Sequence, residues 1–293
     1  MKPLNDIFNR LRSIVTAAGI FAAVPFAYAE GEVIEIWPDG APHDNGLSDR
    51  EDRSNPTSIV ANSHALLTVY PADSPDGRIV MMCPGGGYTH LAAGHEGHDM
   101  APWFNARGIT YAVLEYRMPA GNREIPFEDA EQGMRILKAN AQKWGGDPAR
   151  VGIAGASAGG HLAATVAVLH TDSVSRPAFQ ILFYPVVSMQ EGVTHQGSRQ
   201  NLLGENPDAE SVRRYSLQNS VDGDTPPAFI MLSADDTVVP PKNSFDYASA
   251  LIGNGVPVEM HVYPTGGHGW GFGDYFPYKP QWTMELDAWL GQQ

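Results

Sequence analysis

The sequence of 293 residues predicts an α/β fold in which a mostly parallel central sheet is covered by helices on both faces. Short apolar runs rich in Val and Ile, typical of buried strands, alternate with longer segments whose apolar residues recur every three or four positions, typical of helices. Glycines and polar residues follow several of the predicted strands. Because ligands bind at the carboxyl ends of parallel strands, these turns are the candidate functional region.

The first 29 residues are typical of a cleavable export signal. Three basic residues precede an apolar run at 14–26, and Ala27-Tyr28-Ala29 supplies a small-residue cleavage site. The apolar run is shorter than the roughly 20 residues of a membrane-spanning helix, and Pro25 interrupts it. We therefore expect cleavage after residue 29, export to the periplasm or beyond, and a mature chain of residues 30–293 that forms one domain.

The predicted strands share apolar, often β-branched residues and lie at 32–37, 65–71, 78–84, 109–116, 150–155, 179–187, 228–234 and 257–264. The predicted helices lie at 98–108, 126–146, 158–170, 209–217, 244–255 and 281–290. The helix at 126–146 shows the pattern clearly, because Ala130, Met134 and Leu137 fall on one face and a pair of glycines ends it. The stretch 188–227 is polar, and the helix predicted at 209–217 lies within it.

Acidic residues dominate the mature chain. Removal of the first 29 residues takes away three basic residues and one acidic residue, which leaves 16 Lys and Arg against 32 Asp and Glu and a net charge of −16. Such a surface repels nucleic acid and anionic lipid, so we expect no nucleic-acid partner and no membrane binding after signal cleavage. Cys83 is the only cysteine, which excludes an intramolecular disulfide.

A Gly-x-Ser-x-Gly turn, made by Gly155, Ser157 and Gly159, joins the strand at 150–155 to the helix that follows it. Such a turn forces the serine into a strained backbone conformation, and the flanking glycines allow the tight approach of strand and helix. The serine is then presented at the end of a strand. The pattern predicts Ser157 as a nucleophile.

A serine nucleophile needs a histidine base, and the base needs a carboxylate to hold its tautomer. Asp235 and Asp236 follow the strand at 228–234, and His268 lies in a glycine-rich loop after the strand at 257–264. The chain order serine, aspartate, histidine is the one expected with this serine turn. We assign His268 as the base and Asp236 as its partner, because Asp236 opens an Asp-x-x-Val-Pro segment, and Asp235 stays the alternative.

The glycine run at 85–87 directly follows the strand at 78–84. Attack on an ester carbonyl creates an oxyanion, which backbone N–H groups must stabilise. Ala158, the residue after the nucleophile, is one expected donor. Gly86 and Gly87 are the others, because glycine lets an acyl oxygen come close, and a plain flexible turn is the alternative.

Three histidines, His90, His95 and His98, lie close to Glu96 in the sequence. Their spacing is not that of the zinc-binding helix, in which the second histidine follows four residues after the first. We therefore expect neither a metal nor a cofactor. His161, next to the serine turn, is expected to pack or to form hydrogen bonds at the start of its helix.

Several segments together carry a family resemblance: IWPDGAP, CPGGGY, LEYRMP, DPARVGIAGASAGGHLAA, FYPVVSM, DDTVVPP and GGHGWG. From about Trp37 to the C-terminus, the chain resembles the α/β-hydrolase esterases, and more closely the secreted carbohydrate acetylesterases of the acetylxylan-esterase-like or xylanase-B-like type. The resemblance implies the same site residues: nucleophile Ser157, base His268, its partner Asp236, and an oxyanion hole around Gly86, Gly87 and Ala158. It also implies that the stretch 188–227, in which HQGSRQNLLG is similar to the family's pattern, is a short insertion over the site. Pro84 stands where lipases and esterases usually carry a histidine, which favours the carbohydrate-esterase branch.

The sequence thus predicts a secreted serine esterase that removes acetyl groups from plant cell-wall carbohydrate such as xylan, with an acylated carbohydrate or small ester as its partner. We expect Tyr88 and Trp270 to contact the substrate, Trp270 by stacking on a sugar, while most other aromatic residues of 270–282 pack the last helix. Alternatives stay open: a feruloyl esterase or general short-chain carboxylesterase, a serine peptidase of the same fold, or a non-catalytic carbohydrate-binding protein.

Overall fold

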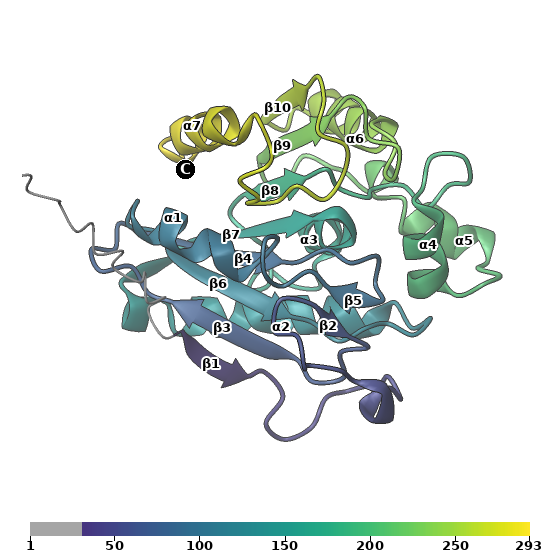
Figure 1. Cartoon of the computed structure of the whole chain (residues 1–293), viewed down its shortest axis with the longest axis horizontal. Helices are drawn as coiled ribbons and strands as arrows, with labels where there is room; N and C mark the ends of the chain where they lie inside the picture. The colour runs from purple at the N-terminus through teal and green to yellow at the C-terminus, as the bar shows by residue number, and fades with distance from the viewer. Residues whose placement is uncertain (1–30) are drawn as a thin grey trace, which may run out of the picture.

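The computed structural model describes residues 31–293, so the predicted export signal at 1–29 lies outside the described residues. Within them, eight strands form the main sheet in the spatial order β1 (Glu32–Glu35), β3 (Leu66–Tyr70), β6 (Thr110–Glu115), β4 (Gly77–Cys83), β7 (Gly146–Ala156), β8 (Gln180–Phe183), β9 (Ala228–Ser233) and β10 (Val258–Tyr263) (Figure 1). β3 is antiparallel to both of its neighbours, and every other neighbouring pair is parallel. The predicted mostly parallel sheet is confirmed.

The α-helices in the described part of the chain are α1 (Ala101–Asn105), α2 (Glu124–Ala139), α3 (Ser157–Leu169), α4 (Gln196–Leu203), α5 (Ala209–Arg214), α6 (Lys242–Gly253) and α7 (Lys279–Leu290). A small second sheet pairs β2 (Ile59–Val60) with β5 (His90–Leu91). Of the helices in residues 31–293, none has the length and apolar composition needed to cross a bilayer.

Helices cover both faces of the main sheet, as β6 illustrates. Side chains alternate between the two faces of a strand, and Tyr111 stacks on Phe104 of α1 with ring centroids 4.6 Å apart, whereas Leu114 points to Gly133 of α2. α7 lies beside α1, with aromatic rings of the two helices 6.1 Å apart, and α3 packs on α2. Because both faces are covered, all six residues of β6 are buried.

Several elements differ from their predicted bounds. The predicted helix at 126–146 ends at Ala139 and is followed by a 3-10 turn at Ala141–Trp144, so the glycine pair does not end the helix: Gly145 closes the turn and Gly146 begins β7. The predicted helix at 98–108 is a 3-10 turn at His98–Met100 followed by the short α1. The predicted strand at 179–187 ends at Phe183, because the next residue, Tyr184, has a left-handed φ of +36° and cannot continue a strand. The stretch 188–227 contains α4 in addition to the predicted short helix, α5.

Candidate active site

The Gly-x-Ser-x-Gly turn joins β7 to α3, and Ser157 is the first residue of the helix. Its φ of +54° is a left-handed conformation that a serine rarely adopts. A Cβ on Gly155 would lie 2.1 Å from the carbonyl oxygen of Gly159, and a Cβ on Gly159 would lie 2.1 Å from that of Cys83. Glycine is therefore required on both sides, and the turn presents the Ser157 hydroxyl at the carboxyl end of the sheet.

The structure brings Ser157, His268 and Asp236 together in one chain of hydrogen bonds. His268 Nε2 lies 2.8 Å from Ser157 Oγ, and His268 Nδ1 lies 2.6 Å from Asp236 Oδ2. The other carboxylate oxygen of Asp236 accepts the backbone N–H groups of Val238 and Val239, both at 2.9 Å. The carboxylate is thus fixed on one side and orients the imidazole with the other.

Asp235, the alternative carboxylate, has a different role in the same region. Its carboxylate accepts the backbone N–H groups of Gly266 at 3.3 Å and Gly267 at 2.8 Å. These glycines begin the loop that carries His268. Asp235 therefore anchors that loop, and the geometry assigns the imidazole contact to Asp236.

The glycine loop at 85–87, which follows β4, is shaped so that the N–H groups of Gly86 and Gly87 stay free. Gly86 has a φ of +126°, and a Cβ there would lie 2.0 Å from the carbonyl oxygen of His90, so no other residue fits. Among the described groups, none accepts the N–H of Gly86 or Gly87. Ala158 lies in the first turn of α3, where N–H groups have no partner within the helix. Gly86 and Gly87 line the pocket over Ser157, and Ala158 directly follows Ser157 in the chain, so the predicted oxyanion-hole donors lie near the nucleophile.

Glu96 connects the glycine loop to the loop after β10 that carries His268, called the histidine loop below. The sequence did not reveal this role. Its buried carboxylate accepts the N–H of Gly85 at 3.0 Å through one oxygen and the hydroxyl of Tyr184 at 2.6 Å through the other. The Tyr184 hydroxyl in turn accepts the N–H of Gly271 at 2.7 Å. Burial, with Glu96 beside it, raises the pKa of Tyr184 well above its usual value, so the hydroxyl keeps the proton that it donates.

Of the histidines near Glu96, His95 contacts the loop that carries His268, whereas His98 contacts residues of the strands β3 and β6. His95 Nε2 lies 3.0 Å from the carbonyl oxygen of Gly269, next to His268. His98 contacts the Tyr70 hydroxyl at 2.8 Å. No group of three or more His, Cys, Asp or Glu side chains in residues 31–293 is arranged to hold a metal ion.

A pocket of about 490 Å³ opens over Ser157, between the glycine loop, the histidine loop and α4. His195 caps α4: its Nδ1 accepts the backbone N–H of Ser198 at 3.3 Å, so the ring proton is on Nε2. Burial and the neighbouring His268 lower the pKa of His195, which favours this neutral form. His195 therefore offers one N–H donor at the pocket wall.

Asn201 of α4 lines the same pocket and supports the glycine loop. Its Nδ2 donates to the carbonyl oxygen of Gly87 at 2.8 Å. The sequence pointed to the segment that contains His195 and Asn201 through the family resemblance alone. No chemical signal in that polar stretch distinguishes a pocket residue from a solvated one.

The two predicted substrate contacts, Trp270 and Tyr88, are wrong for the catalytic pocket, because both side chains are buried behind it. Trp270 is 0% exposed, stacks on Phe276 at 4.0 Å and donates from Nε1 to Ser233 Oγ at 3.0 Å. Tyr88 is 2% exposed, and its hydroxyl lies 3.0 Å from Nδ1 of His161. Neither residue lines the pocket over Ser157.

His161 packs beneath the site, in line with the sequence-based expectation. Its Nε2 donates to the carbonyl oxygen of Tyr215 at 2.9 Å, and its Nδ1 faces the Tyr88 hydroxyl. Burial lowers the pKa of His161 to about 4, so the ring is neutral near pH 7.

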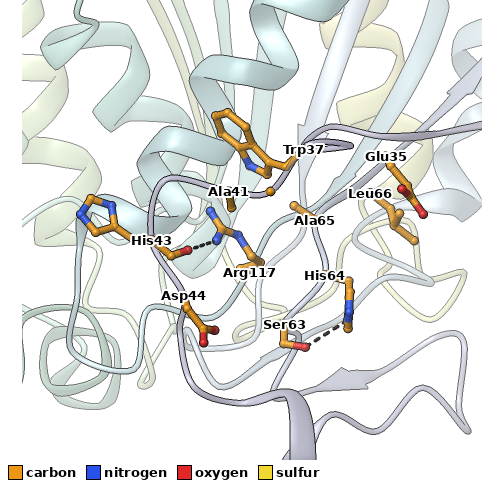
Figure 2. Close-up of a pocket in the computed structure, with 11 residues that line it drawn as sticks. Glu35, Trp37, Ala41, His43, Asp44, Ser63, His64, Ala65, Leu66 and Arg117 are labelled. Atoms are coloured by element: carbon orange, nitrogen blue, oxygen red, sulfur yellow. Dashed lines mark hydrogen bonds between the residues drawn. The ribbon is translucent and has the colours of Figure 1, made fainter.

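A separate pocket of about 330 Å³ shares no lining residue with the catalytic one (Figure 2). At its base, the Arg117 guanidinium contacts both oxygens of the buried Asp129 and also donates to the carbonyl oxygen of His43. Trp37 Nε1 donates to the same aspartate at 2.7 Å. These polar groups satisfy one another, so this pocket is a structural junction between the N-terminal segment and α2.

Comparison with known proteins gives a consistent family. Residues 80–272 match the family model of the alpha/beta hydrolase fold. The chain is 43% identical over 237 residues to an acetylxylan esterase of Xylanibacter ruminicola, an alignment that covers 80% of this chain and 49% of the relative. It is 36% identical over 205 residues to an endo-1,4-beta-xylanase B of Butyrivibrio fibrisolvens, with coverage of 65% and 32%.

A solved structure agrees with these relatives. The acetyl ester-xyloside bifunctional hydrolase of Caldicellulosiruptor lactoaceticus superposes with a TM-score of 0.76 at 36% identity, and the match covers 90% of this chain and 96% of that one. The chain spans about half the length of the first curated relative and about a third of the second. The resemblance stated from the sequence is confirmed.

Proposed function

Because the chain belongs to the α/β-hydrolase fold family, we propose that it is a serine carboxylic-ester hydrolase that removes acetyl groups from plant cell-wall carbohydrate such as xylan or xylo-oligosaccharides. One observation carries the proposal: Ser157, His268 and Asp236 form an unbroken hydrogen-bonded chain beside the free N–H groups of a glycine loop. A nucleophile, its base, the partner of the base and donors for an oxyanion are what acyl transfer needs.

In the acylation half of the reaction, His268 Nε2 takes the proton of Ser157 Oγ as that oxygen attacks the ester carbonyl. Asp236 stabilises the imidazolium that results. The N–H groups of Gly86, Gly87 and Ala158 stabilise the negative oxygen of the tetrahedral intermediate. When the intermediate collapses, His268 gives its proton to the departing sugar oxygen, and the acetyl group stays on Ser157.

In the deacylation half, water replaces the sugar. His268 takes a proton from the water as its oxygen attacks the acetyl carbonyl, and the same N–H groups meet the second oxyanion. Collapse returns the proton to Ser157 Oγ and releases acetic acid, which ionises at neutral pH. The free enzyme is restored without any other reactant.

Two features support acetylated carbohydrate as the substrate. The relatives named above include an acetylxylan esterase and an acetyl ester-xyloside hydrolase. The wall of the catalytic pocket also carries the polar side chains of His90, His195 and Asn201. Side chains of this kind can form hydrogen bonds with sugar hydroxyls, which a long apolar acyl chain does not offer.

The composition of the pocket argues against ferulate as the acyl group. No Phe, Tyr or Trp among the described residues lines the pocket over Ser157, so a phenolic ring would find no aromatic face on which to stack. A general short-chain carboxylesterase remains the alternative, because a small acyl group needs no such face.

Release of the acyl group from a panel of substrates tests the proposal. The purified protein is given acetylated xylo-oligosaccharides, feruloylated arabinoxylan fragments and 4-nitrophenyl acetate, and free acetate and ferulate are measured by chromatography. We expect acetate from the xylo-oligosaccharides and no ferulate. Ferulate release at a comparable kcat/KM, or cleavage of the 4-nitrophenyl ester alone, would contradict the proposed substrate.

The proposal includes export of the protein, since cell-wall carbohydrate lies outside the cytoplasm. The predicted signal at residues 1–29 supports it. A mature protein that begins at Glu30, identified by mass spectrometry of the periplasm or medium, is the expected result, and an unprocessed chain confined to the cytoplasm would contradict it.

A further inference from the structure

A second pocket adjoins the catalytic one. It has a volume of about 430 Å³, and two residues, Thr89 and Asn201, line both pockets. Thr89 follows the glycine loop and Asn201 belongs to α4, so the catalytic pocket and its neighbour meet between these two segments. The volume lies within the roughly 300–1,000 Å³ of small-molecule sites. Thr89 and Asn201 thus form a boundary that both pockets share, and a ligand over Ser157 that extends past this boundary reaches the second pocket.

The wall of the second pocket contains strained backbone. Among the described residues, five that are not glycine have a left-handed φ, and three of them line this pocket: Ala61 at +49°, Tyr88 at +62° and Ala120 at +47°. The other two, Ser157 and Tyr184, belong to the catalytic centre. Strained conformations persist where the surrounding structure imposes them, and they concentrate at active sites and ligand clamps.

The side chains of the second pocket suit a neutral, hydroxyl-rich ligand. No described group pairs with the side chains of Arg50 or Gln200, and Asn201 keeps its Oδ1 free while its Nδ2 holds the glycine loop. Arg50 and Glu205 are the charged residues in the lining, and their opposite charges favour neither an anion nor a cation. Leu47 and other apolar residues add a surface for the C–H face of a sugar ring.

We propose that the second pocket is a glycan subsite, which binds the sugar units next to the acylated one while the ester lies over Ser157. The inference rests on the proposed function and narrows its substrate to oligosaccharides and polymers. Arg50 and Gln200 donate hydrogen bonds to hydroxyl groups of the bound glycan, and Asn201 accepts one.

The kinetic test compares a large and a small substrate. For the variant Arg50→Ala/Gln200→Ala, the ratio of kcat/KM for acetylated xylotetraose to kcat/KM for 4-nitrophenyl acetate is expected to fall about tenfold, because only the oligosaccharide reaches the subsite. Arg213→Ala is the matched control: this exposed arginine of α5 lies outside both pockets, and its loss changes the net charge as the loss of Arg50 does. The ratio should stay constant in the control.

A direct binding measurement separates the subsite from the chemistry. Unacetylated xylotetraose and mannotetraose are titrated calorimetrically into the Ser157→Ala protein, and circular dichroism verifies the fold of each variant. We expect at least one of the two to bind, and to bind about tenfold more weakly when Arg50 and Gln200 are also replaced. No binding, or binding that the two replacements do not change, would overturn the subsite. If binding depends on Arg50 and Gln200 but the wild-type protein releases no acetate from any substrate, the subsite is supported and the proposed ester hydrolysis is contradicted.

Discussion

In residues 31–293, two clusters contain a serine, a histidine and a carboxylate, and only one of them has the geometry of a catalytic triad. In the first, Ser157 and Asp236 contact opposite nitrogens of His268. In the second, beside the pocket of Figure 2, Ser63 Oγ and Glu51 Oε2 both contact the same nitrogen, Nδ1, of His64, at 3.0 and 2.5 Å.

The difference lies in the path that a proton can take. In the first cluster, a proton can pass from Ser157 Oγ to His268 Nε2, while Asp236, which contacts Nδ1, stabilises the positive charge of the imidazolium. In the second cluster, Ser63 donates directly to Glu51 at 2.6 Å, so the hydroxyl is already held by the carboxylate. His64 is also 70% exposed at its side chain, against 13% for His268. Residue types and proximity are therefore insufficient, and the order of contacts decides which cluster can catalyse.

Replacing each serine in turn tests this distinction most strongly. Ser157→Ala is expected to lower kcat/KM for 4-nitrophenyl acetate by about 10⁴–10⁶-fold, because the nucleophile is lost while the fold is kept. Ser63→Ala should leave kcat/KM unchanged. A fluorophosphonate probe, with the labelled peptide located by mass spectrometry, should mark Ser157 alone. Labelling of Ser63, or near-normal activity of Ser157→Ala, would reverse the assignment.

The ion pair at the base of the pocket in Figure 2 should affect the stability of the fold rather than the catalytic rate. Arg117 and Asp129 form an ion pair with side chains 4% and 0% exposed. Arg117→Met leaves the Asp129 carboxylate buried without its partner, which should lower the free energy of unfolding by about 3–5 kcal/mol. Urea denaturation at pH 7 measures this loss, and kcat of the folded fraction should not change.

Removing both charges provides the control for this ion pair. Arg117→Met/Asp129→Leu should recover part of the stability that Arg117→Met loses, because no uncompensated charge stays buried. If the single variant were as stable as the wild type, or if the double variant were the less stable of the two, the ion pair would not be the source of the stability.

The catalytic assignment could be predicted from the sequence because each of its parts follows a strand. The carboxyl ends of parallel strands meet at one edge, so Ser157, Asp236 and His268 converge once the alternation of strands and helices is recognised. Positions at which only glycine fits can also be recognised in the local sequence. Gly86, Gly155 and Gly159 all lie where a Cβ would overlap a backbone oxygen.

The residues that support the catalytic groups could not be predicted. Their contacts join positions far apart in the sequence and follow no periodic pattern. Glu96 reaches Tyr184 across 88 residues. α4 escaped prediction because it is short and polar and is capped by a histidine, which is not among the usual capping residues. The sequence shows that aromatic residues are concentrated at 270–282, but it does not show which of them are buried. Trp270 is buried, whereas Tyr275 is 71% exposed.

The smallest expected effect concerns the positioning of the catalytic groups by Glu96. In Glu96→Gln, one carboxylate oxygen becomes an NH₂ group, which cannot accept from the N–H of Gly85 or the hydroxyl of Tyr184. One of these buried donors loses its acceptor, so the glycine loop or the histidine loop shifts. We expect kcat for 4-nitrophenyl acetate to fall by about 10–100-fold with little change in KM.

A matched control distinguishes positioning from a general loss of structure. Tyr275→Phe removes a hydroxyl that donates to the carbonyl oxygen of Gly269 at 3.0 Å from an exposed ring, so the histidine loop loses one contact while the Glu96 link stays intact. Its kcat should stay near that of the wild type. Equal losses of kcat in the two variants, or a loss in Glu96→Gln fully explained by a smaller folded fraction in thermal unfolding, would contradict the positioning role. A lower kcat in a fully folded Glu96→Gln protein would instead mean that the bare glycine backbone is effective only while Glu96 holds it in register with His268.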